Sequence, residues 1–101
     1  MRFRREMRAL AQLQHRNIVT LYDATEIDGL ALLAMELCPG GTLAAWCAAA
    51  RRTPSELLGV FVQAGEGLAA AHSAGFVHRD FKPTNVLMGS DGHPRVGDLI
   101  G

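Results

Sequence analysis

The sequence predicts a small α+β fold, because helical and strand-like hydrophobic patterns alternate along its 101 residues. Residues 2–14 and 54–73 repeat apolar side chains at spacings of three and four, which predicts two helices. Residues 18–24 and 30–37 are strand-like, and an Asp-Gly dipeptide typical of hairpin turns joins them. A chain of this length forms one small domain with a hydrophobic core of its own.

The composition is that of a globular protein without a net charge. Hydrophobic residues make up 49% of the chain and charged residues 20%, which is typical of folded domains and not of disordered ones. Ten basic residues balance ten acidic ones, so we expect no nucleic-acid partner. The longest apolar run, residues 30–35, is far shorter than the roughly 20 residues that span a bilayer. We therefore expect no membrane contact from this segment.

The cysteine pattern argues against a structural metal. Cys38 and Cys47 are the only cysteines, and neither belongs to a pair with histidines at metal-ligand spacing. Such sparse cysteine usage is typical of a reducing compartment, so we expect a cytoplasmic location.

The first predicted helix carries an acidic residue on its apolar side. Phe3, Leu10 and Leu13 fall at helical spacings, and Glu6 lies on or beside the same face. A carboxylate is costly to bury there unless a cation meets it. From the pattern alone two interpretations stay open: Glu6 reaches water from the edge of the face, or it pairs with a cation.

A loop and a short helix follow the second strand. Pro39-Gly40-Gly41 interrupts the strand pattern, and an alanine-rich helix is expected at residues 43–50. The glycine pair does not predict a phosphate-binding loop, because no G-x-G-x-x-G or G-x-x-x-x-G-K pattern follows it.

The long helix at residues 54–73 has clear start and stop signals. Thr53 and Glu56 form a capping box with proline at the first helical position, and Gly75 is a typical stop. Gly65 and Gly67 each weaken a helix by roughly 1 kcal/mol relative to alanine, so both predict close packing against a neighbour. The apolar face is expected at Leu57, Phe61, Ala64, Leu68 and Ala71.

The last quarter of the chain predicts a polar loop followed by a β-hairpin. Residues 86–88 and 95–97 are strand-like, and residues 89–92 between them form a Gly-Ser-Asp-Gly turn. The polar loop, residues 78–85, directly precedes the hairpin.

This loop carries the residues that point to chemistry. It contains Asp80, Lys82 and Asn85, and Asp98 follows across the hairpin, which returns the chain so that Asp98 can face Asn85. Asn and Asp supply the hard oxygen ligands that Mg²⁺ prefers. Asp80 can accept a proton from a hydroxyl, and Lys82 can neutralise charge on a phosphoryl group. Singly, such residues are usually surface ion pairs or turn residues, and only the joint spacing predicts phosphoryl transfer.

The string from His78 to Asn85 resembles the H-R-D-L-x-x-x-N catalytic loop of protein kinases, with Phe81 in place of leucine. The resemblance covers the whole chain in order, from helix C to the Asp-Phe-Gly region. It implies a partial protein-kinase fold, with residues 1–37 as the remainder of the N-lobe and residues 38–101 as the hinge and the first part of the C-lobe. It also implies ATP and Mg²⁺ as cofactors, and Lys82 indicates serine and threonine hydroxyls of proteins as substrates. The alanine-rich character looks most like bacterial eukaryotic-type kinases.

The same resemblance assigns nucleotide-binding positions. Glu6 would pair with the strand-3 lysine, Met35 would be the gatekeeper, Glu36 to Cys38 would be the hinge facing adenine, and Leu87 would form the floor beneath it. Asp80, Lys82 and Asn85 would be catalytic, and Asn85 and Asp98 would hold the metal. The stacked hydrophobic spine is expected at Leu10, Leu21, His78 and Leu99.

Two departures from the family pattern leave alternatives open. The 101 residues contain no glycine-rich loop and no strand-3 lysine, so we expect this chain to be inactive by itself. Asp98-Leu99-Ile100-Gly101 stands where Asp-Phe-Gly is expected, and isoleucine lacks the backbone freedom of glycine. One alternative is a non-catalytic kinase remnant, and another is a small-molecule phosphotransferase, against which Lys82 argues. The sequence carries no signal for the oligomeric state.

Overall fold

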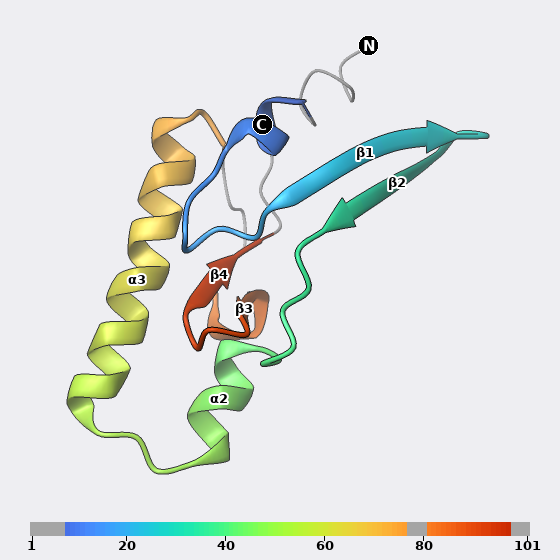
Figure 1. Cartoon of the computed structure of the whole chain (residues 1–101). Coiled ribbons are helices and arrows are strands. Elements are labelled where there is room, and N and C mark those ends of the chain that lie inside the picture. The colour runs from blue at the N-terminus through green and yellow to red at the C-terminus, as the bar shows by residue number, and fades with distance from the viewer. Residues whose placement is uncertain (1–7, 77–80, 98–101) are drawn as a thin grey trace.

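The computed structural model describes residues 8–76 and 81–97, which form the small α+β arrangement that the sequence predicts (Figure 1). Two antiparallel two-stranded sheets and the helices around them make up this part of the chain. In chain order the elements are β1 (Leu21–Ile27), β2 (Leu30–Met35), α2 (Leu43–Ala49), α3 (Pro54–Ser73), the 3₁₀ turn η1 (Pro83–Asn85), β3 (Val86–Met88) and β4 (Pro94–Val96).

The hairpin of β1 and β2 turns where the sequence predicts. Asp28 and Gly29 both have positive φ, at 50° and 80°, as the two central residues of a type I′ turn require. The pairing runs from Ile27 with Leu30 to Leu21 with Met35, and its register shifts near Tyr22. The turn prediction is therefore confirmed.

The first strand begins later than the predicted range of 18–24. Residues 17–19 pair with the second hairpin instead: the Val19 amide donates to the Val96 carbonyl at 2.9 Å, and the Val96 amide donates to the Asn17 carbonyl at 2.8 Å. Ile18 forms a parallel bridge with Val96. Residues 17–19 are buried, so this short segment belongs to the core and not to the β1–β2 hairpin.

The first predicted helix is only partly within the described residues. Residues 8–12 are helical, and a turn follows in which the Leu13 amide donates to the Leu10 carbonyl at 3.1 Å. The helix therefore ends two residues before the predicted residue 14, and the part before Arg8 lies outside the described residues. Leu10 and Leu13 pack against a buried cluster, which agrees with their place on the predicted apolar face.

Both α2 and α3 begin with a threonine cap, of which the sequence analysis predicted the one at Thr53. The Thr42 side chain accepts a hydrogen bond from the Ala45 amide, and the Thr53 side chain accepts one from the Glu56 amide, both at 3.1 Å. At the other end of α3, Gly75 has a φ of 91° and the Phe76 amide donates to the Ala71 carbonyl, a Schellman motif. The predicted helix at residues 54–73 is confirmed.

The buried face of α3 matches the predicted one only in part, at Ala64 and Ala71. Val60, Ala64, Gly67 and Ala71 are buried, whereas Phe61 is 43% exposed. Leu57 and Leu68, also predicted on the buried face, are only half-buried. The reason is that small residues let α3 approach its neighbour closely, and the larger side chains are left at the edge of this contact.

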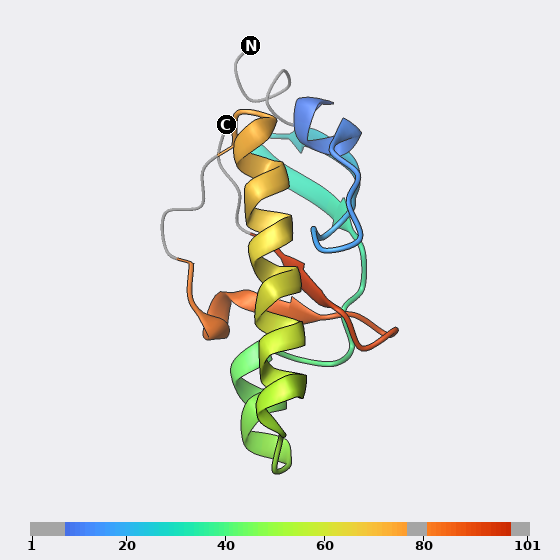
Figure 2. The same ribbon diagram turned by 90° about the vertical axis from the view of Figure 1, so that its left-hand side faces the viewer.

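Two buried clusters hold α3 against the rest of the chain. Figure 2 shows α3 running along one side of the molecule, with the β3–β4 hairpin behind its middle and α2 beside its first turns. The first cluster joins α2, α3 and β3 and consists of Leu43, Val60, Ala64, Val86 and Met88. The second lies at the C-terminal end of α3 and consists of Ile18, Ala71 and Phe76.

Candidate functional site

The described part of the predicted site lies at the entry to the β3–β4 hairpin. Lys82 and Asn85 belong to it, and Leu87 follows on β3. Asp80, Asp98 and Glu6 lie outside the described residues, as do the spine positions His78 and Leu99. Their roles stay predictions.

A tight turn places Asn85 at the start of β3. Lys82 has an extended backbone, with φ at −152°, and Pro83 opens the 3₁₀ turn η1. The Asn85 amide donates to the Lys82 carbonyl at 2.8 Å, which closes this turn. Lys82 is exposed and Asn85 is half-buried, so the turn holds an amide side chain beside an exposed cation.

The hairpin register brings Gly97 back to the end of the hairpin at which Asn85 stands. Val86 pairs with Val96, Leu87 with Arg95, and Met88 with Pro94. Asn85 directly precedes the first of these pairs and Gly97 directly follows it, so the chain enters and leaves the hairpin at the same end. That Asn85 and Asp98 act together stays a prediction, because Asp98 lies outside the described residues.

The residues between β2 and α2, which we call the linker (residues 36–42), lie alongside β3. The Gly40 amide donates to the Met88 carbonyl at 3.1 Å, and the Met88 amide donates to the Gly41 carbonyl at 2.8 Å. A Cβ at Gly40 would lie only 2.7 Å from the Cβ of Met88, so only glycine permits this approach. Thr42 bridges to Leu87. The hairpin thus has the linker on one side and residues 17–19 on the other (Figure 1).

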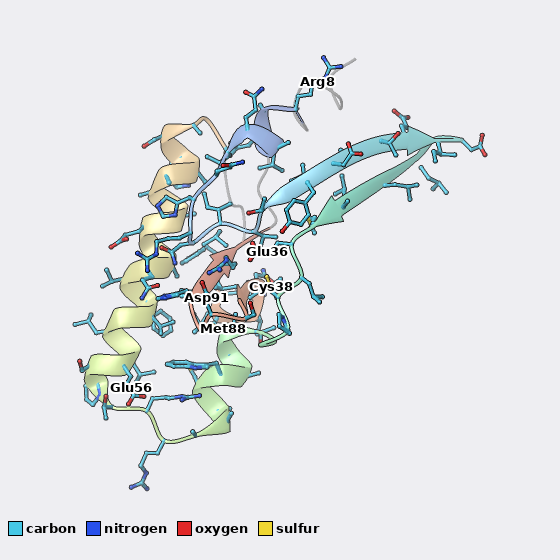
Figure 3. All side chains as sticks on the ribbon, viewed as in Figure 1. Arg8, Glu36, Cys38, Glu56, Met88 and Asp91 are labelled. Atoms are coloured by element: carbon cyan, nitrogen blue, oxygen red, sulfur yellow. The ribbon has the colours of Figure 1, made fainter. Side chains whose placement is uncertain are left out.

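The predicted hinge residues have different surroundings. Met35 is 53% exposed at the end of β2, and Cys38 is half-buried in the linker. Burial, with a smaller contribution from the charge of Glu36, raises the pKa of the Cys38 thiol. Figure 3 shows Glu36, Cys38, Met88 and Asp91 gathered around the second hairpin.

Arg95, which the sequence analysis did not single out, is a buried charge that binds two carboxylates. It is 8% exposed, its Nε atom lies 3.1 Å from Glu36 Oε2, and its Nη2 atom lies 2.8 Å from Asp91 Oδ2. Its Nη1 atom also donates to the His93 carbonyl at 3.1 Å. Burial disfavours the guanidinium charge, yet the hydrogen bonds to Asp91 and Glu36 hold the pKa of Arg95 above its ordinary value. The sequence signal that could have identified Arg95 is its charge, which is unusual inside a predicted strand such as 95–97.

The two carboxylates that Arg95 binds come from different parts of the chain. The hydrogen bond from Arg95 is the main reason that the pKa of Asp91 falls to about 2. Glu36 is anchored a second time, because its Oε1 atom accepts from the Thr20 amide at 3.1 Å. Its own amide donates to the Thr20 carbonyl at 2.8 Å. Glu36 therefore ties the start of the linker both to β4 and to the residue that precedes β1.

A second polar group fixes residues 17–19 against α3 and β4. Asn17 is fully buried, and its Nδ2 atom donates to the Pro94 carbonyl at 3.1 Å and to Gln63 Oε1 at 3.3 Å. The Nδ1 atom of His93 lies 2.6 Å from the same Gln63 oxygen. Because that oxygen only accepts, His93 donates through Nδ1 in this arrangement.

The oxygen chemistry of Asn85 fits a magnesium nucleotide. Its amide oxygen is a hard donor of the kind that Mg²⁺ takes, and the second proposed ligand, Asp98, lies outside the described residues. Within residues 8–76 and 81–97, no three His, Cys, Asp or Glu side chains are grouped to hold a metal ion. No helix in this part of the chain is long and apolar enough to cross a membrane.

Comparison of the sequence with known proteins identifies the family to which this chain belongs. A family model described as "Protein kinase domain" matches residues 1–99, and the chain belongs to this family. It is 42% identical over 99 residues to the serine/threonine-protein kinase PknL of Mycobacterium tuberculosis, covering 97% of this chain and 25% of the relative. It is 41% identical over 99 residues to the probable serine/threonine-protein kinase pknA2 of Bifidobacterium longum, covering 97% of this chain and 13% of the relative.

A third relative shows the same pattern of coverage. The chain is 39% identical over 99 residues to the serine/threonine-protein kinase PrkC of Bacillus subtilis, covering 97% of this chain and 15% of the relative. The chain therefore spans between 13% and 25% of the length of these three relatives. The predicted family is confirmed, and the relatives support a serine/threonine kinase by resemblance.

Proposed function

We propose that the protein carrying this chain transfers the γ-phosphoryl group of ATP to serine and threonine hydroxyls of other proteins. The observation that carries the proposal is the loop of residues 78–85, whose Asn85 stands at the entry to β3 while Gly97 leaves β4 at the same end. The names of the relatives support the phosphotransfer chemistry, and Lys82 favours serine and threonine over tyrosine.

The roles of the loop residues follow from what phosphoryl transfer needs. Mg²⁺ and ATP, when bound, supply the phosphoryl group and neutralise the charge on its oxygens. Asp80 orients the substrate hydroxyl and accepts its proton, and Lys82 stabilises negative charge near the transferred group. Asn85 and Asp98 would hold the metal through their side-chain oxygens. Positioning and electrostatics supply nearly all of the catalysis, so the loop geometry matters more than any single reactive group.

The nucleotide base would contact the first residues of the linker and Leu87 of the hairpin. Met35 would be the gatekeeper, Glu36 and Cys38 would belong to the hinge, and Leu87 would form the floor. The approach of the linker to β3, through Gly40 and Met88, supports this assignment. Glu6 would pair with a strand-3 lysine. In this proposal residues 1–37 belong to the N-lobe of a kinase domain and residues 38–101 to the hinge and the C-lobe.

The decisive experiment substitutes the proposed base in a protein that carries these residues within a complete kinase domain. Asp80→Asn should lower phosphate transfer from γ-labelled ATP to a generic protein substrate by a factor of about 10² to 10⁴. Binding of Mg·ATP should persist, because Asp80 does not hold the phosphates. The matched control is Asp28→Asn, the same change at the β1–β2 turn, where asparagine also tolerates positive φ. Near wild-type turnover in Asp80→Asn would contradict the proposal.

A further inference from the structure

Arg95 connects the linker to the β3–β4 hairpin. The proposed function requires these two parts to stay in a fixed position relative to each other. It lies on β4, directly opposite Leu87 in the hairpin, and Leu87 is the proposed floor beneath adenine. It binds Glu36, the first residue of the linker, at 3.1 Å although 59 residues separate the two in sequence. The hydrogen bond thus joins the proposed hinge to the strand that leads toward Asp98.

The two carboxylates around Arg95 differ in what they anchor. Asp91 belongs to the same hairpin as Arg95 and is four residues away, so this pair at 2.8 Å is local. Glu36 belongs to the linker, and its side chain and backbone also bind Thr20. The pair of Arg95 with Glu36 is therefore the one that fixes the linker relative to the hairpin.

The burial of these groups makes the arrangement specific. The side chains of Arg95 and Glu36 are 10% and 19% exposed, so water screens their interaction only weakly. The planar guanidinium presents several donors in a fixed geometry, which suits two carboxylates and a carbonyl at once. A Cβ at Gly89 would lie 2.9 Å from the guanidinium carbon, so the guanidinium packs against the hairpin turn where a glycine leaves room for it.

We propose that Arg95 is a positioning residue for nucleotide binding, holding the linker through Glu36 at a fixed place beside the hairpin that carries the metal-binding end of the site. This inference rests on the proposed function. A linker that already has its bound geometry loses less conformational entropy when adenine binds, so the ion pair increases nucleotide affinity. Chemistry on the phosphates depends on it less, because Lys82 and Asn85 precede β3 whereas the linker binds its last residue, Met88.

Two isosteric substitutions test the proposal, each removing the charge of one partner of Arg95. Glu36→Gln should raise the KM for ATP about tenfold and change kcat less than twofold, in a protein that carries these residues within a complete kinase domain. The glutamine oxygen can still accept from the Thr20 amide, so the change is confined to the ion pair. The matched control is Asp91→Asn, which removes the other carboxylate charge and should leave KM within twofold. Equal KM changes in the two variants would overturn the proposal, because they would show a general structural role.

A double-mutant cycle tests whether Glu36 acts on nucleotide binding through Arg95. Arg95→Gln should raise KM about as much as Glu36→Gln, and the double variant should be no worse than Arg95→Gln alone, because both changes break the same interaction. Additive changes in KM would overturn the assignment.

Amide hydrogen exchange tests, independently of activity, whether the contact of Glu36 with Arg95 holds the linker in place. We call this contact the clamp. In Glu36→Gln the amides of Glu36 and Gly40, which bind the Thr20 and Met88 carbonyls, should exchange at least several times faster than in Asp91→Asn. Equal exchange in both variants would contradict the clamp even if the protein is an active kinase. If the wild-type protein transfers no phosphate, the proposed function is wrong. If the exchange rates still differ as expected, Glu36 and Arg95 hold the linker in place all the same.

Discussion

Gly67 of α3 lies so close to the backbone of Asn17 that no side chain fits between them: a Cβ at Gly67 would overlap the Asn17 carbonyl oxygen. That carbonyl also accepts the hydrogen bond from the Val96 amide at 2.8 Å. The contact therefore fixes α3, residues 17–19 and β4 in one place. Gly65, two residues earlier on the same helix, is exposed, and a Cβ there would meet nothing within 4 Å. The close packing predicted for both glycines occurs only at Gly67.

Alanine substitutions at these two glycines should have opposite effects on stability. Gly67→Ala should lower the free energy of unfolding by about 1–3 kcal/mol, because the added methyl group overpacks a buried contact. Gly65→Ala should raise it by up to about 1 kcal/mol, because alanine is the better helix former and has room. Urea denaturation of both variants measures the two changes. A stabilised Gly67→Ala protein would contradict the contact.

The proposed metal ligands should be needed for binding of the magnesium nucleotide and not of the base. Asn85→Ala or Asp98→Ala should weaken Mg·ATP binding at least tenfold in calorimetry, because each removes an oxygen ligand of the proposed metal site. Adenosine binding without metal should remain nearly unchanged. Thr84→Ala, at the exposed neighbour of Asn85, is the control. Equal losses for Mg·ATP and adenosine would indicate misfolding instead of a lost metal site.

Acidic pH should lower the free energy of unfolding, because it protonates Asp91. Its pKa is lowered from 3.8 to about 2, so it binds protons less readily in the folded state than in the unfolded state. The stabilisation it supplies is complete above pH 4 and is lost as the pH falls from about 4 toward 2. Asp91→Asn should therefore flatten the dependence of the unfolding free energy on pH in this range, measured by urea denaturation at several pH values. Glu66→Gln, at an exposed site on α3, should keep the steeper dependence of the parent protein. Equal slopes in both variants would contradict the Asp91–Arg95 interaction.

A polypeptide of residues 1–101 expressed by itself should transfer no phosphate. It contains no glycine-rich loop and no strand-3 lysine to hold the phosphates, and positioning supplies most of the catalysis. It should also bind hydrophobic dyes and melt without a sharp transition, because large apolar side chains are exposed. They include Leu58, Phe61 and Val62 on α3, and Leu30, Leu32, Leu33 and Met35 on β2.

The same assays on a complete kinase domain provide the comparison for the short polypeptide. The complete domain should melt cooperatively, bind little dye and transfer phosphate. A sharp cooperative melt of the short polypeptide together with Mg²⁺-dependent transfer would contradict the expectation and require a compensating phosphate site.

The sequence by itself determined the features that depend on neighbouring residues. The turn at Asp28 and Gly29, the cap at Thr53 and the stop at Gly75 were all predicted, because each depends on the backbone preferences and side-chain oxygens of a few adjacent residues. The family was predictable for a related reason, since the spacing within one loop specifies it.

Tertiary structure decided which surfaces meet. Helical periodicity placed Leu57, Phe61 and Leu68 on the core side of α3, yet close backbone approach at Gly67 selected a neighbouring face. The pairing of Arg95 with Glu36 across 59 residues left no signal except a charge within a strand, since no local rule relates two residues so far apart. Local chemistry determines how each segment bends, but only the assembled core determines which side chains come within bonding distance.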